Sequence, residues 1–436
     1  MSNGTDGYQS AFGTGSGSES GRSRAADLGL YPARFHREMA PVWLSMILNA
    51  RGLAAPALQG TRWCEIGCGQ GIDTLILAAA NPDMDFVGID IDPRHIEAGQ
   101  DMARRAGLTN ARLIHADIRD PGSLPDLGAP FDFILSHGVY SWVSGDVQAA
   151  IHGFIADRLA PGGVAALHYL SQPGAAQFSA LRAALAAMGP AEVTVATRLQ
   201  RLVKMAEAGA GLMAEHPRMA RLLTQLQSEP EEFVAHEYLT RDCSLLTAGE
   251  MITRMGDQGL VYAGSTRPIE NYDNVSLPAR TQSLIAAEPD GILRENLRDI
   301  ARNQPHRFDI YVNQPQHLDP QTRAALAAKR RFMQLRQVRA PLVFETAVGP
   351  VDGPAEIFTP ILDHLARGPV DLLTLAQLPQ FAGQAGAVEQ ALLMLVGAGI
   401  AHPMLPVQPS PKAADRLNAV LPAGGLRAVP GIGSAL

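Results

Sequence analysis

The chain has 436 residues, of which 46% are hydrophobic and 18% charged, so it is long enough for two or three globular domains with buried cores. Its formal net charge of -7 argues against nucleic acid as a main partner. No apolar run approaches the roughly 20 residues that a membrane-spanning helix requires, so we expect no membrane insertion.

Residues 1–27 are rich in Gly and Ser and lack the apolar core of a signal peptide, so they are expected to form a disordered tail. The chain has three cysteines, and no two of them form a CxxC pair. The adjacent His236 and Glu237 lack the HExxH spacing of a zinc site, so no metal is expected. The cysteine usage favours a reducing cytoplasm.

A helical pattern with one apolar stripe occupies residues 28–55 and predicts a lid or flank before the first strand. Strand and helix patterns then alternate. The expected strands are 62–66, 86–90, 111–116, 131–136 and 164–169, and the expected helices are 72–80, 93–106 and 146–159. Pro161, Gly162 and Gly163 predict a tight turn before the fifth strand. This alternation predicts an α/β fold with a parallel, doubly wound sheet.

After Ser171 the chain becomes rich in Ala, Leu and Arg, which predicts helical insertions at 174–245 and 268–303. A helix at 248–256 and a strand at 259–264 are expected between the two insertions. A further strand is expected at 306–312, after the second insertion. Together with the first five strands, these two predict a seven-stranded Rossmann-like sheet that ends in an antiparallel edge. We expect residues 28–313 to form one domain.

Residues 314–436 predict a small, α-rich domain of winged-helix type. The expected helices are 355–365, 372–378 and 387–396, followed by a turn into a strand at 397–402. Pro360 should break or kink the first of them. The third carries no cluster of Arg and Lys, which argues against DNA binding. The last residues look extended and weakly specified.

The stretch from Glu65 to Gly71 reads Glu-x-Gly-x-Gly-x-Gly between an expected strand and an expected helix. Gly67, Gly69 and Gly71 would let the main chain approach a ligand closely, and the helix behind them offers free N–H groups. Dinucleotide-binding loops use Gly-x-Gly-x-x-Gly, so the spacing disfavours NAD. Glu65 would order the loop or place a negative group near the amino-acid tail of S-adenosylmethionine.

Two further strand ends carry carboxylates. Asp90 stands 19 residues after Gly71, where it could accept hydrogen bonds from both hydroxyls of a ribose, with Ile91 beside it. The alternative is an ordinary strand-end residue, although Asp92 is the better helix cap. Asp117 could accept from the amino group of an adenine. Ile118 would then pack on the ring.

With these motifs in place, the chain resembles class I S-adenosylmethionine-dependent methyltransferases. The run His137-Gly138-Val139-Tyr140-Ser141-Trp142-Val143, with Ala235–Leu239 and Glu270–Asp273, is similar to bacterial methyltransferases that carry a methyltransferase regulatory domain. That family includes protein lysine methyltransferases that act on outer-membrane proteins. The resemblance covers roughly residues 31–312, and it implies an enzyme with S-adenosylmethionine as its cofactor.

The implied reaction is an in-line displacement that moves a methyl group to a nucleophile on a protein or a small molecule. A lysine acceptor must first lose a proton, because only the neutral amine attacks, and burial lowers the pKa of a lysine. Ser136 and His137 could contact the methionine part of the cofactor. Tyr140 could align an amine through its ring face or hydroxyl, and Trp142 is expected to pack. His137, Tyr140, His168 or Tyr169 could assist the deprotonation as catalytic residues, although His168 could equally be a core histidine.

Two segments depart from the family pattern. After the fifth strand, residues 169–175 lack the Asn and Trp of relatives, and residues 240–244 lack the expected Pro and aromatics. Both flank the expected acceptor site, so they bear on the acceptor more than on the cofactor. A non-catalytic S-adenosylmethionine-binding regulator remains an alternative, as does, with less support, an NAD-dependent oxidoreductase. The sequence predicts no oligomeric state.

Overall fold

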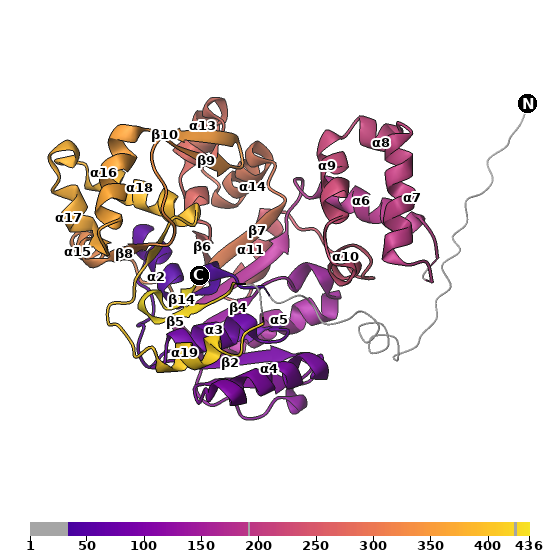
Figure 1. Cartoon of the computed structure of the whole chain (residues 1–436), viewed down its shortest axis with the longest axis horizontal. Helices are drawn as coiled ribbons and strands as arrows, with labels where there is room; N and C mark the ends of the chain where they lie inside the picture. Colours follow the sequence, from indigo (N-terminus) through magenta and orange to yellow (C-terminus); the bar gives the residue numbers. More distant parts are fainter. Residues whose placement is uncertain (1–33, 191, 423–424) are drawn as a thin grey trace, which may run out of the picture.

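A computed structural model describes residues 34–190, 192–422 and 425–436, so the expected tail at 1–27 lies outside the described residues. A central sheet with its flanking helices carries two further parts. A helical lobe follows the fifth strand, and a C-terminal unit stands across from it (Figure 1).

The central sheet has seven strands in the order β3-β2-β1-β4-β5-β7-β6. Strands β1 to β5 run parallel, and β7 is antiparallel to both β5 and β6. The predicted Rossmann-like sheet is confirmed, with the reversed strand one place inside the edge. The strands are β1 Arg62–Ile66, β2 Asp85–Asp90, β3 Ala111–His115, β4 Phe131–Ser136, β5 Leu159–Leu170, β6 Leu260–Ser265 and β7 His306–Asn313.

Helices flank this sheet where the sequence places them: α3 Ile72–Ala80, α4 Pro93–Ala106, α5 Gly145–Arg158 and α11 Ala248–Gly256. Asp92 caps α4 by accepting from the Arg94 amide, and Gly107 ends it with a φ of 60°. The turn expected at 161–163 lies inside the span of β5, between the pairs Phe131↔Leu159 and Phe133↔Val164. Gly162 takes a φ of 76°, and the pairing with β4 is irregular there.

The segment before the sheet forms a short 3-10 turn, η1 Arg37–Met39, and the helix α2 Pro41–Ala50. The prediction of one apolar stripe on a lid or flank is wrong, because Pro41 to Asn49 are all buried. The helix lies between the sheet and the C-terminal unit, so every side needs apolar groups. The Trp43 indole N–H donates to the carbonyl of Thr266 at 2.7 Å.

Both helical insertions are present. The first forms a separate lobe of helices (Figure 1). The lobe has its own buried cluster of mainly Leu, Met and Tyr side chains. Its helices are α6 Ala176–Ala187, α7 Val195–Glu207, α8 Gly211–Ala214, α9 Pro217–Leu226 and α10 Glu231–Tyr238. The second holds η4 Pro268–Asn271, α12 Asp273–Ser276, α13 Ala279–Ala286 and α14 Gly291–Arg302.

The C-terminal unit contains the three helices expected from the sequence and a three-stranded sheet, β11-β8-β12. The winged-helix assignment stays a prediction. Pro360 does not break α16, because buried Phe358, Ile361 and Leu362 anchor the helix on both sides of it. The elements are α15 Pro320–Lys329, β8 Arg331–Gln334, β9 Leu342–Thr346, β10 Gly349–Gly353, α16 Ala355–Leu365, β11 Val370–Asp371, α17 Leu372–Ala376, α18 Ala385–Gly397 and β12 Ala401–Pro403.

The chain end returns to the central sheet, which the sequence did not predict. It holds α19 Lys412–Asn418, β13 Ala428–Val429, η6 Pro430–Ile432 and β14 Ser434–Ala435. The Asn81 amide, just beyond α3, donates to the Gly433 carbonyl at 3.0 Å, and Arg416 Nε donates to the Ala106 carbonyl at 2.7 Å. The end is therefore fixed against α3 and α4. Across the ranges described, no helix combines the length and the apolar content of a membrane span.

Candidate functional site

The carboxyl ends of β1 to β5 meet at one edge of the sheet, and β1 lies between β2 and β4. The loop after β1 leads to α3, while the loop after β4 leads to α5 on the other face of the sheet. Such a divergence of neighbouring loops opens a ligand crevice in doubly wound folds. The motifs at Glu65–Gly71, Asp90, Asp117 and His137 all stand at this edge.

The three loop glycines have positive φ angles of 74°, 54° and 71° at Gly67, Gly69 and Gly71. A Cβ atom at Gly67 would lie 2.3 Å from Val139 Cγ2, and one at Gly71 would lie 2.8 Å from Leu113. At Gly69 a Cβ would meet nothing within 4 Å. Gly67 and Gly71 thus allow tight packing, whereas Gly69 leaves open space on the loop where a ligand can approach.

The two carboxylates next to the loop hold its shape. Asp90 accepts from the Gly69 amide through Oδ2 and from the Asp92 amide through Oδ1, each at 2.8 Å. Glu65 is 3% exposed and accepts from the Thr74 hydroxyl at 2.6 Å. Burial and the nearby Asp73 raise the pKa of Glu65 well above its usual range. Of its two predicted roles, these contacts support ordering of the loop.

Beyond Asp90, the side chain of Ile91 is 56% exposed, which is unusual for a large apolar residue at a strand end. Asp117 is ion-paired with Arg119, whose hydrogen bonds lower the pKa of that carboxyl. The sequence reasoning missed Arg119, which also pairs with Asp146 at 2.9 Å. Ile118 is half-buried against the core beneath it.

The loop after β4 separates its residues between the two faces of the sheet. Ser136 is fully buried, and its hydroxyl donates to the Ile66 carbonyl at 3.0 Å, which ties β4 to β1. The half-buried Trp142 donates its indole N–H to the Glu237 carbonyl at 3.4 Å, so it packs against α10, and this contact accounts for part of the Ala235–Leu239 motif.

Tyr140 does not lie where the sequence reasoning placed it. Its ring is fully buried in the core between the sheet, α5 and α11. Its hydroxyl bonds to His152 at 2.9 Å and accepts from Arg254 at 3.2 Å. The predicted substrate role of Tyr140 is therefore wrong in this structure, because its ring and hydroxyl are both used inside the protein.

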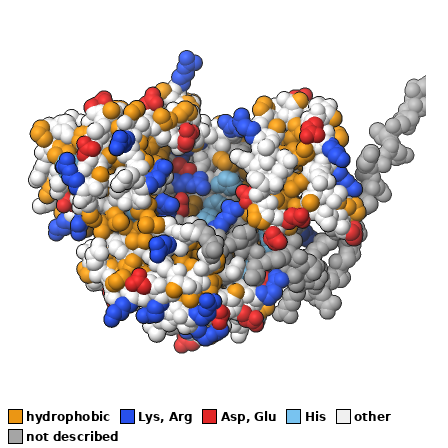
Figure 2. Space-filling view, viewed as in Figure 1, with side chains coloured by type: hydrophobic (Ala, Val, Ile, Leu, Met, Phe, Trp, Pro, Cys, Tyr) orange, Lys and Arg blue, Asp and Glu red, His pale blue; other side chains and the backbone are white. Residues whose placement is uncertain are grey.

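His137 belongs to a stack of four imidazole rings that we call the histidine row: His36, His137, His168 and His306. The ring centroids are 3.7 Å apart for His36 and His137, 4.2 Å for His137 and His168, and 5.7 Å for His168 and His306. Phe308 contacts the row edge-on, at 5.1 Å from His137. Figure 2 shows histidine side chains in a hollow between the C-terminal unit and the helical lobe.

The two ends of the row differ in their electrostatic surroundings. Burial lowers the pKa of His36, but the Asp73 carboxylate at 2.9 Å outweighs burial and raises it above 6.5. Burial, then neighbouring histidines, hold the pKa values of His137 and His168 well below 6.5. Burial and Arg267 lower that of His306 to about 4. At neutral pH the last three rings are therefore uncharged.

Sequence reasoning found His137 and left His168 open, but it missed His36 and His306. The register of β5 and β7 sets His306 opposite Leu170, two residues from His168 and on the same face. Only the pairing of these strands, which are distant in sequence, reveals that relation. Within the described ranges, no three His, Cys, Asp or Glu side chains are grouped to hold a metal.

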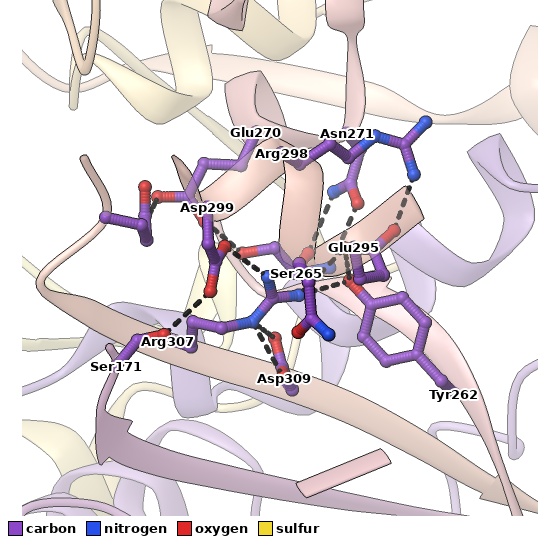
Figure 3. A network of polar contacts seen from close by, with 12 residues as sticks. Ser171, Tyr262, Ser265, Glu270, Asn271, Glu295, Arg298, Asp299, Arg307 and Asp309 are labelled. Carbon is purple, nitrogen blue, oxygen red and sulfur yellow. Dashed lines mark hydrogen bonds and ion pairs between the residues drawn. The ribbon is translucent and has the colours of Figure 1, made fainter. Parts of the chain in front are cut away.

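A buried polar network supports the sheet behind the row (Figure 3). The Arg307 guanidinium contacts Asp299 at 2.5 Å, Asp309 at 2.9 Å and Glu295 at 3.0 Å. Asp299 also accepts from the Ser171 hydroxyl at 2.7 Å. One arginine thereby joins β7 to α14 and to the end of β5.

The Glu270-Asn271 motif belongs to the same support (Figure 3). Glu270 accepts from the Ser265 hydroxyl at 2.6 Å and from Gln304 at 2.8 Å, and Asn271 accepts from the Ser265 amide at 2.9 Å. The motif fixes the turn that follows β6.

Two parts of the chain match known protein families. A family model described as a methyltransferase domain matches residues 64–165, and one described as a predicted methyltransferase regulatory domain matches residues 230–313. The chain therefore carries a methyltransferase domain followed by a methyltransferase regulatory domain. The regulatory match takes in β6, α12 to α14 and β7, so most of the helical lobe lies between the two matched ranges.

Similar proteins come from bacteria. An uncharacterized protein of Synechocystis is 27% identical over 386 residues, which cover 86% of this methyltransferase and 75% of that protein. A second, from Rickettsia prowazekii, is 35% identical over 144 residues, 33% of this chain and 56% of that one. The alignment thus spans little more than half of the Rickettsia protein.

The structure of PKMT2 from Rickettsia typhi shares the fold, with a TM-score of 0.70 at 22% identity over 86% of this chain and 77% of that chain. PKMT2 in complex with AdoHcy gives a TM-score of 0.68 at 21% identity, with the same coverage.

Proposed function

We propose that this methyltransferase transfers its methyl group to an amine, with the side chain of a protein lysine as the favoured acceptor. The observation that carries the proposal is the histidine row. Its uncharged rings line the crevice beside the strand end of β4, and two of its nitrogens have no partner among the described residues. An amine can donate to such nitrogens.

The cofactor would bind on the open side of Gly69, where an added Cβ atom meets nothing within 4 Å. Asp90 would hold the ribose hydroxyls, and the exposed Ile91 would cover one face of the adenine, with Ile118 near the ring. Asp117 would accept from the adenine amino group while it keeps its pair with Arg119. When bound, S-adenosylmethionine supplies a methyl group that its sulfonium has already activated. AdoHcy bound to PKMT2 supports the same ligand class here.

The residues of the chain contribute position and charge. The acceptor nitrogen must be neutral to form its bond to the methyl carbon as the C–S bond breaks, with the electron pair of that bond left on sulfur. Neutral imidazoles accept hydrogen bonds from an amine and, unlike carboxylates, add no ionic attraction to its ammonium form. When the protein holds the acceptor nitrogen and the methyl carbon in line, most of the entropy of bringing two reactants together is lost on binding and not in the chemical step. His137, the ring nearest β4, would contact the methionine part.

The domain layout follows from these roles. We assign the methyltransferase domain to 28–313, with helical insertions at 174–245 and 268–303, and a separate C-terminal domain to 314–436. The end of that C-terminal domain returns to the methyltransferase domain, where the Gly433 carbonyl accepts from the Asn81 amide. The cysteines, all free in the described residues, support a reducing cytoplasm.

The acceptor can be identified with a tritiated methyl donor and fractionated bacterial extract. We expect label in the protein fraction, recovered as methyllysine after hydrolysis, and none with Gly69→Ala. Label confined to acceptors other than amines would contradict the amine proposal, and label confined to lipid or small-molecule amines would contradict lysine as the acceptor.

A further inference from the structure

His168 and His306 form the inner end of the histidine row and come from adjacent strands, β5 and β7. Their rings are nearly parallel, at an angle of 14°. His168 is 8% exposed, and the Nδ1 atoms of both residues are buried without a hydrogen-bond partner in the described structure. A buried polar atom without a partner costs free energy, so such a pair indicates a ligand.

The charges around the pair disfavour a cation between the rings. Arg267 lies close enough to lower the pKa values of both His168 and His306, and at the far end His36 acts on His168 in the same direction. Of the nearby carboxylates, Asp73 pairs with His36, and Glu270 is engaged by Ser265, Arg267 and Gln304. Glu38 and Arg34 act on His36 only at that outer end.

We propose that His168 and His306 form the acceptor subsite, where their unpartnered Nδ1 atoms accept the N–H groups of a neutral amine next to His137. This inference rests on the proposed amine specificity and names the residues that enforce it. Both rings must carry their proton on Nε2, which leaves Nδ1 as an acceptor. A primary amine offers two N–H donors, whereas a carboxylate or a thiolate offers none.

Substitutions test the subsite through the split between KM and kcat. His168→Phe removes the acceptor atom, so the KM for the acceptor should rise roughly tenfold, the usual worth of a lost hydrogen bond. His168→Asn places an amide near the position of Nδ1 and should restore most of the affinity. We expect His306→Phe to raise this KM in the same way and His306→Asn to restore most of the affinity. An unchanged KM in both Phe variants would overturn the inference.

The matched control is His152→Phe. His152 is also buried and its pKa is lowered to about 4, but it contacts Tyr140 on the other face of the sheet. We expect an unchanged KM for the acceptor in this variant. All of these variants should bind S-adenosylhomocysteine with the affinity of the wild type. Unchanged cofactor affinity shows that a higher KM for the acceptor comes from loss of the subsite and not from loss of the fold.

A second measurement does not depend on turnover. In ¹⁵N-labelled protein with S-adenosylhomocysteine, n-butylamine should shift the Nδ1 resonances of His168 and His306. The shift should grow as the pH rises toward the ordinary lysine pKa of about 10.4, because only the neutral amine binds. If the Nδ1 resonances shift but no amine is methylated, the proposed function is contradicted while the amine-binding subsite is supported. Methylation without shifts would overturn the subsite alone.

Discussion

Gly69 shows how much depends on single positions in the loop. Three glycines share one motif and one left-handed conformation, yet two are enclosed by Val139 and Leu113 and only Gly69 opens outward. The sequence indicated that glycine was needed at all three. It could not say why, because the atoms that enclose Gly67 and Gly71 come from other strands and loops.

The variant Gly69→Ala should bind S-adenosylhomocysteine at least tenfold more weakly, because its Cβ enters the space assigned to the cofactor. It should also lose about 1 kcal/mol of stability from its positive φ. Gly60→Ala is the matched control, since Gly60 has a φ of 65° and an equally open Cβ position outside the crevice. Equal affinities in the two variants would contradict the assignment.

The structure reverses the expectation for Tyr140. Because the hydroxyl bonds to His152 and Arg254 in the core, Tyr140→Phe should keep normal methyl transfer and lose about 1 kcal/mol of stability. Turnover and thermal unfolding of the same preparation check both parts. A large fall in turnover with unchanged stability would restore the catalytic role.

The His36–Asp73 pair predicts a pH effect on stability. The folded pKa of His36 is raised by Asp73, against the effect of burial, so protonation stabilises the fold. That contribution is complete below the unfolded pKa of about 6.5 and is lost as the pH rises through the folded value. The unfolding midpoint of the wild type should therefore fall across this range relative to His36→Gln. If the unfolding midpoints of the wild type and His36→Gln change in parallel with pH, the predicted contribution of the His36–Asp73 pair is refuted.

At the scale of elements, local patterns predicted the strands and helices of the sheet closely, because apolar periodicity and Gly or Pro signals are local. Burial on all sides of α2 was missed, since its second cover comes from the C-terminal unit. The histidine row was missed for the same reason. It joins β4, β5, β7 and the segment before η1, which only the tertiary fold brings together.

Arg307 is expected to be the most sensitive structural residue of this region. Arg307→Leu leaves Asp299 and Asp309 buried without their cation and Glu295 with Arg298 alone, which should cost about 3–5 kcal/mol of the free energy of unfolding. Arg323→Leu is the control, because its pair with Glu389 is partly exposed and worth about 0–1 kcal/mol. Denaturant unfolding compares the two, and similar losses would contradict the role of the network.

At the scale of the whole molecule, the segment before η1 connects the parts around the hollow. Arg34 pairs with Glu229 of the helical lobe at 3.2 Å and lies over the ring of Phe233, while His36 pairs with Asp73 of α3. The helical lobe and the glycine loop are thus linked through three consecutive residues. The chain end contacts the residue just beyond α3, where Asn81 donates to the Gly433 carbonyl.

The loop from Glu65 to Gly71 is proposed to bind the methyl donor beside an amine site. Titration calorimetry of the full chain with S-adenosylhomocysteine and, separately, with NAD tests this most directly. We predict micromolar binding of S-adenosylhomocysteine, lost in Gly69→Ala and kept in Gly60→Ala, and no response to NAD. Binding of NAD without S-adenosylhomocysteine, or full affinity in Gly69→Ala, would contradict the account.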